Sequence, residues 1–264
     1  MFFLNEEIEI TRPAHYAGSF YPKEKIKLEK MIKSFLKNTN KKVNGKLKAL
    51  IVPHAGYVYS GIVAGKGYNL LKESKKSNII LFGPSHYAAI NGAYGFSENW
   101  STPLGTTKIT SIDLPVIRND TEHSLEVQLP FLQYIIPKTR LDLTSIIYGD
   151  IPSEELADII NTTKNEDSVL IASSDLSHYL SYDIAKKIDT NTINAILNLD
   201  LEKFSKEAEA CGKIGIEALI ILTKKNNWKP VLLEYKNSGD TKGNKESVVG
   251  YTCIAFTEEK ERIG

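Results

Sequence analysis

The sequence has 264 residues, of which 42% are apolar, and its 33 lysines and arginines nearly balance its 32 aspartates and glutamates. The lysines are scattered along predicted helices, so we expect no basic stripe and no binding of nucleic acid. No run of about 18 apolar residues is available to span a bilayer, and the start of the chain is acidic rather than basic, which predicts a soluble cytoplasmic protein with no membrane partner.

The first third of the chain alternates between helical and strand-like patterns. The predicted elements are an amphipathic helix over residues 23–38, a polar linker over 38–46, a buried strand over 47–52, a packed helix over 60–71 and a second buried strand over 78–82. Because a helix connects the two buried strands, we expect them to pair in parallel through a right-handed crossover.

The middle of the chain has a weaker pattern. Residues 88–119 carry Gly, Pro, Ser and Thr at short intervals and predict short strands or a hairpin around Trp100–Gly105. A helix is predicted from Thr121 and should be kinked or shortened by Pro130. Another strand is predicted over residues 141–148.

The remaining sequence returns to a clear alternation. The predicted elements are a helix from Ser153, a strand over 168–173, helices over 182–198, 201–210 and 211–225, and two strands over 230–236 and 247–258, joined as an antiparallel hairpin by the polar loop 237–246. We therefore predict one α/β domain over residues 1–264, with a mixed, largely parallel central sheet flanked by helices on both faces.

All five histidines lie in short polar motifs punctuated by glycine, proline or serine, rather than on apolar faces. They are His15, His54, His86, His123 and His178. His54, His86 and the Asp175/His178 pair each follow the carboxyl end of a predicted buried strand. Ligands bind at this edge of an α/β sheet, so we expect these side chains to face one region.

Neutral imidazoles are common metal ligands, and two or three of them with a thiolate or carboxylate suit iron, copper or zinc. The sequence has no H-x-x-x-H or C-x-x-C pair, so histidines that merely cap strands are the alternative. Asp175 could fix a histidine tautomer, act with His178 as an acid–base pair, or simply cap its loop.

The two cysteines have different surroundings. Cys253 lies in a strand-like run, where a small buried thiol is ordinary core. Cys211 precedes Gly212 at a predicted helix start, whose amides favour a thiolate, so it is either structural or reactive. A disulfide between them is not needed in an intracellular chain of this size.

Other catalytic motifs are missing from the sequence. There is no G-x-S-x-G elbow, no G-x-x-x-x-G-K-[ST] loop and no G-x-G-x-x-G fingerprint, which argues against a serine hydrolase, an NTPase and a dinucleotide enzyme. Ser173 or Ser174 near Asp175 and His178 only superficially resembles a catalytic triad.

Six motifs resemble, in the same order, those of the Memo family. They are Arg12–Pro22, Val52–Tyr57, Phe82–His86, Glu122–Pro130, Ser173–His178 and Cys211-Gly212. The resemblance covers nearly the whole chain. It implies a single α/β domain similar to the class III extradiol dioxygenases, which hold a non-haem iron with two histidines and a carboxylate.

Motif by motif, the resemblance implies that His54, His86 and Cys211 are metal ligands. The candidate catalytic residues that line the same pocket are His123, Asp175 and His178. The implied cofactor is iron or copper, with zinc as an alternative. A thiolate in place of the carboxylate favours copper or a redox role over insertion of dioxygen into a catechol.

One departure from the family pattern follows the cysteine, where Lys213-Ile214 replaces the histidine-proline that relatives often carry. The ligand itself is retained, but its surroundings differ. Prokaryotic and archaeal members resemble one component of a three-part system, so a radical-SAM protein and an AMMECR-type protein are the implied partners.

Two functions are consistent with these features. The first is a metal-dependent redox protein or oxygenase-like enzyme that acts on a small substrate in the His54, His86 and Cys211 pocket. The second is a non-catalytic binding module or metal sensor that uses the cleft to bind a peptide or partner protein, because resemblance transfers fold better than activity.

Overall fold

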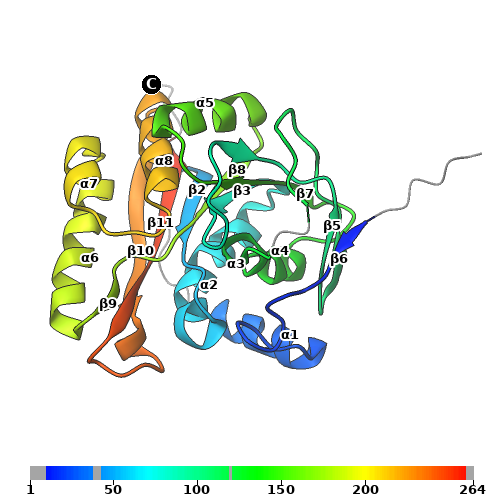
Figure 1. Cartoon of the computed structure of the whole chain (residues 1–264), viewed down its shortest axis with the longest axis horizontal. Coiled ribbons are helices and arrows are strands. Elements are labelled where there is room, and N and C mark those ends of the chain that lie inside the picture. The colour runs from blue at the N-terminus through cyan, green and yellow to red at the C-terminus, as the bar shows by residue number, and fades with distance from the viewer. Residues whose placement is uncertain (1–9, 38–42, 119–120, 260–264) are drawn as a thin grey trace, which may run out of the picture.

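The computed structural model describes residues 10–37, 43–118 and 121–259. Its main sheet is mixed (Figure 1). In spatial order its strands are β10 (Lys229–Asn237), β11 (Val248–Glu258), β2 (Lys46–Val52), β8 (Val169–Ser173), β3 (Asn78–Pro84), β7 (Asp142–Tyr148) and β4 (Ala93–Tyr94), and β9 (His178–Leu180) pairs with one end of β11. The four strands from β2 to β7 run parallel, which confirms the predicted single α/β domain with a mixed sheet.

The predicted pairing between the first two buried strands is wrong. β2 and β3 are parallel, but β8 lies between them and pairs with both. Ala49 of β2 lies opposite Leu170, and Ile79 of β3 lies opposite Val169. Every residue of β8 is buried and the first four are apolar, as expected of a strand at the centre of the sheet.

Helices cover both faces of the sheet, as predicted. Alternate strand residues point to opposite sides, so Leu50 belongs to one core and Ile51 to the other. One face is covered by α1 (Lys25–Phe35), α2 (Tyr57–Ser74), α3 (His123–Glu126) and α4 (Leu129–Ile135); the other is covered by α5 (Ser153–Thr163), α6 (Tyr182–Leu197), α7 (Leu201–Glu207) and α8 (Lys213–Lys225) (Figure 1).

A small second sheet lies beside the first. The predicted hairpin is present as β5 (Asn99–Thr102) and β6 (Gly105–Thr107), and β1 (Thr11–Arg12) adds to β5 in parallel, which the sequence did not predict. The predicted helix from Thr121 is divided into α3 and α4. Pro130 lies in the first turn of α4, where its missing N–H is tolerated.

The remaining differences concern boundaries. The helix α8 begins at Lys213 rather than at Cys211, so the cysteine lies in the preceding turn. The C-terminal pair β10 and β11 is antiparallel as predicted, and a short 3-10 helix, Ser238–Asp240, lies in the loop between them. Within the described ranges, no helix is both long and apolar enough to cross a membrane.

Candidate metal centre

Three neighbouring parallel strands each carry a candidate site residue two positions beyond their carboxyl end. β2, β8 and β3 end at positions 52, 173 and 84, and two residues later the chain carries His54, Asp175 and His86, respectively. The carboxyl ends of parallel strands meet at one edge of the sheet, so the three loops converge there. The expected convergence of the strand-end histidines is therefore present in the structure.

His54 is held in one orientation by buried polar groups. Its side chain is 2% exposed, and Nδ1 lies 3.0 Å from Ser173 Oγ. The Ser173 hydroxyl donates its single proton to the carbonyl of Ser124, 2.6 Å away, so it accepts from Nδ1–H. Nε2 of His54 is then left with its lone pair, and it lies 3.2 Å from Cys211 Sγ.

Glu122 fixes the orientation of the His86 ring. The Glu122 side chain is 3% exposed, and its Oε1 lies 2.9 Å from Nδ1 of His86 and accepts the backbone N–H of Ser124 at 2.8 Å. Burial alone would raise the pKa of Glu122, but the adjacent His123 ring and the hydrogen bonds from the ring and backbone N–H of His86 outweigh it and hold that pKa well below its usual value. A carboxylate only accepts, so Nδ1 of His86 donates to Glu122, and Nε2 is the ring nitrogen left for a metal ion.

His123 completes a cluster of three imidazoles. Its ring centroid lies 4.5 Å from that of His86 and 5.1 Å from that of His54. Nδ1 of His123 is 3.0 Å from Oε1 of Glu122, a distance but not an angle typical of a hydrogen bond. The ring packs against Tyr16 and Phe20 of the N-terminal segment.

Cys211 reaches the cluster because the chain passes very close to the sheet edge. A Cβ on the next residue, Gly212, would lie 2.9 Å from the carbonyl oxygen of Ser173, so only glycine allows this approach. Sγ of Cys211 accepts the backbone N–H of Asp175 at 3.2 Å. Burial and the Asp175 charge raise the pKa of the thiol to about 12, so without a cation it stays protonated.

The donor set fits a small transition-metal ion. The ligand atoms of His54, His86 and Cys211 all lie within 4.8 Å of one another, and neighbouring ligands of a tetrahedral ion lie roughly 3.4–3.6 Å apart. The group His86, Glu122 and His123 is equally compact. Glu122 Oε1, however, already accepts two N–H groups, so we favour the first set.

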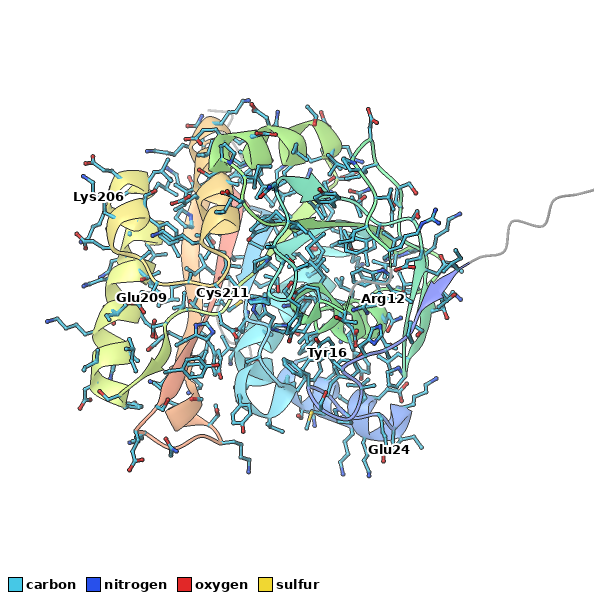
Figure 2. The ribbon with its side chains drawn as sticks, in the orientation of Figure 1. Arg12, Tyr16, Glu24, Lys206, Glu209 and Cys211 are labelled. Atoms are coloured by element: carbon cyan, nitrogen blue, oxygen red, sulfur yellow. The ribbon has the colours of Figure 1, made fainter. Side chains whose placement is uncertain are left out.

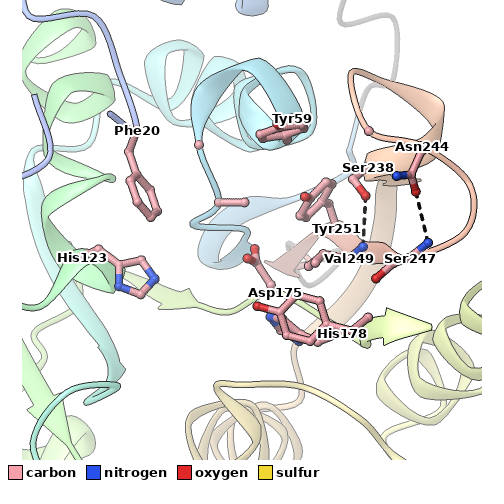
Figure 3. A pocket seen from close by; sticks show the side chains of 14 residues that line it. Phe20, Tyr59, His123, Asp175, His178, Ser238, Asn244, Ser247, Val249 and Tyr251 are labelled. Atoms are coloured by element: carbon pink, nitrogen blue, oxygen red, sulfur yellow. Dashed lines mark hydrogen bonds between the residues drawn. The ribbon is translucent and has the colours of Figure 1, made fainter. Parts of the chain in front are cut away.

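The last two predicted site residues lie beside these donors. Asp175 Oδ1 accepts the backbone N–H of His54 at 2.9 Å, and burial raises its pKa to about 7. Burial also lowers the pKa of His178. Both residues line an open pocket of about 400 Å³ together with His123 (Figure 3). The fifth histidine, His15, is exposed, and its backbone N–H donates to Glu126.

Sequence reasoning missed two buried acids, Glu122 at the N-cap of α3 and Glu126 at its last residue, and their partner Arg12. Arg12 forms a buried ion pair with Glu126 and donates to the carbonyl of Glu122 at 3.0 Å. Glu126 also accepts the hydroxyl of Tyr21 at 2.6 Å and the backbone N–H of Tyr16 at 2.8 Å. Figure 2 shows Arg12 and Tyr16 on the N-terminal segment, which these contacts fasten over α3. The spacing of Glu122 and Glu126, one helical turn apart, was the available signal.

We expect Glu122→Gln to weaken metal binding roughly 10–100-fold, because a neutral amide orients His86 less strongly than a carboxylate does. Titration of the metal-free protein with Zn²⁺ or Fe²⁺ measures the change. Glu202→Gln removes an exposed carboxylate that pairs with Lys206 on α7, and it should leave the affinity unchanged. Equal affinity of Glu122→Gln and the wild type would show that Glu122 does not support the site.

Comparison with known proteins gives matches over almost the full sequence. A family described as Memo-like protein matches residues 12–255. The chain is 36% identical over 258 residues to a MEMO1 family protein of Thermoplasma acidophilum, covering 90% of this chain and 96% of that protein. It is 35% identical to MEMO1 family proteins of Methanosarcina mazei, over 94% of this chain and 99% of that protein, and of Sulfolobus acidocaldarius, over 91% and 97%.

Proposed function

Because the chain belongs to the Memo family, we propose that it is a metal-dependent redox or oxygenase-like protein in which His54, His86 and Cys211 bind iron or copper. The observation that carries the proposal is the arrangement of donors. Their ligand atoms lie within 4.8 Å of one another, and both imidazoles are oriented through Nδ1 by neighbouring groups. Such support at the second nitrogen is typical of metal-binding histidines.

Iron or copper held by His54, His86 and Cys211 would supply one-electron redox chemistry and would polarise a bound small molecule. Zinc would suit the same donors without redox chemistry. The chain itself orients the two imidazoles, holds Cys211 beside His54 and opens a pocket beside the donors. We propose that His123, Asp175 and His178, which line that pocket, exchange protons with a bound substrate.

Metal analysis of protein purified without chelator, followed by oxygen-uptake assays with catechols, tests the proposal. Stoichiometric iron or copper together with oxygen uptake supports a redox enzyme. Stoichiometric metal without uptake favours the metal sensor or binding module. Protein that neither contains metal nor takes it up on reconstitution contradicts the redox enzyme and the metal sensor, and leaves the non-catalytic binding module. Association with a radical-SAM protein and an AMMECR-type protein, and a cytoplasmic location, stay predictions.

A further inference from the structure

The pocket beside the donor set has aromatic walls from separate parts of the chain. Phe20 comes from the loop before α1, Tyr59 from α2, Tyr179 from β9 and Tyr251 from β11. Figure 3 shows Phe20, Tyr59 and Tyr251 around the open centre, with Asp175 between them. A pocket of about 400 Å³ with such walls has the size and surface to hold one small ring-bearing molecule.

The polar part of the pocket carries little positive charge. Among the described residues that line it there are one carboxyl group, Asp175, and two histidines, His123 and His178, and there is no lysine or arginine. The other polar side chains include Ser238, Asn244 and Ser247, which are uncharged. Lys245 is near in sequence, but its ammonium lies over the ring of Tyr182, 4.6 Å from the centroid, and does not line the pocket. An anionic group would therefore lose water here without gaining an ion pair with a lysine or arginine.

Tyr179 has a backbone conformation that is energetically unfavourable for tyrosine. Its φ of 61° is in the left-handed region, which is unfavourable for a residue with a bulky side chain, and the residue is 78% exposed. Its neighbours His178 and Leu180 pair with β11, so the backbone is held in place on both sides. An aromatic ring kept at the pocket wall, exposed and on a strained backbone, is suited to packing against a ligand.

We propose that this pocket binds a small molecule that has an aromatic ring and no net negative charge, and that Tyr179 is the wall on which the ring packs. The inference deepens the proposed function and rests on it, because the pocket is taken as the substrate site of the metal centre. Ring binding and metal binding are nevertheless measured separately, so either can fail alone.

Three phenols test the charge preference with the ring held constant. Tyrosol ends in a neutral alcohol, tyramine in an ammonium and 4-hydroxyphenylacetate in a carboxylate. Calorimetric titration uses the full chain, both as purified and after iron loading, at probe concentrations up to the millimolar range. We expect tyrosol and tyramine to bind, and the carboxylate to bind at least about tenfold more weakly in both metal states. Equal or tighter binding of the carboxylate, or no binding of any probe, overturns the proposal.

Variants of Tyr179 test whether the ring of the ligand packs on this side chain. Tyr179→Ala should weaken tyrosol binding roughly 2- to 10-fold, and Tyr179→Phe should retain it, since stacking needs only the ring. Tyr179→Gly should lose the same affinity while keeping or raising the melting temperature, because glycine adopts this φ without strain. Tyr87→Ala is the matched control, since Tyr87 is 61% exposed and packs on His123 from outside the pocket lining. A loss in Tyr87→Ala as large as that in Tyr179→Ala would overturn the assignment.

The two proposals fail in different ways in these experiments. Metal content is determined on the same samples before each titration. Normal metal loading without ring binding overturns the ligand inference alone. Selective ring binding by protein that cannot be loaded with metal overturns the proposed metal function alone.

Discussion

Cys211→Ser is expected to lower the affinity for Cu(I) by more than the roughly 10–100-fold that loss of a supporting group costs, because the serine hydroxyl is a poor ligand for a soft ion. The fold should tolerate the change. The new hydroxyl would lie among polar partners, namely Nε2 of His54, the hydroxyl of Ser174 and the backbone N–H of Asp175. Copper titration with a competing chelator measures the affinity, and thermal melting of metal-free protein measures the stability.

Cys253→Ser is the matched control with the opposite expected outcome. Cys253 is fully buried in β11, and a Cβ on Gly67 would lie 2.8 Å from its sulfur and 3.2 Å from a methyl of Leu50. A hydroxyl that cannot be satisfied there should cost about 1–3 kcal/mol of stability and leave metal binding unchanged. If Cys211→Ser binds Cu(I) as tightly as the wild type, the metal site is wrong and the partner-binding alternative should replace it.

Arg12→Met should lower the free energy of unfolding by about 3–5 kcal/mol, because it leaves the carboxylate of Glu126 buried without its cation. The side chains of the pair are each 1% exposed, and Arg12 also lies over Trp100, 4.8 Å from the ring centroid. Tyr21 and two backbone amides still donate to Glu126, but none of them carries charge. Urea denaturation followed by fluorescence or circular dichroism measures the change.

A double-mutant cycle separates the ion pair from the lost packing of Arg12. Arg12→Met combined with Glu126→Gln should cost less than the sum of the two single changes, because no unpaired charge is left buried. Lys206→Met serves as the surface control, since Lys206 and Glu202 are 69% and 79% exposed and the pair should contribute less than about 1 kcal/mol. A loss of similar size for Arg12→Met and Lys206→Met would contradict a stabilising role for the buried pair.

Much of the fold was predictable because the chain repeats simple local patterns. Apolar runs such as those of β3 and β8 are long enough to indicate buried strands, and amphipathic spacing gave most helices. The order of strands was not predictable, because β8 enters between β2 and β3 from more than 80 residues later in the chain. Any of several parallel orders would bury the same apolar residues, and only tertiary packing selects one.

The sequence by itself placed His54 and His86 in polar motifs just after predicted strands, and its resemblance to the Memo family implied Cys211 as the third candidate ligand. It could not determine how these groups are oriented. The carboxylate of Glu122 and the hydroxyl of Ser173 fix the two imidazoles from 36 and 119 residues away in sequence. Hydrogen bonds over such separations leave no local periodic pattern. They exist only once the sheet has brought its strand ends together, so tertiary structure alone decided which nitrogens face the candidate metal site.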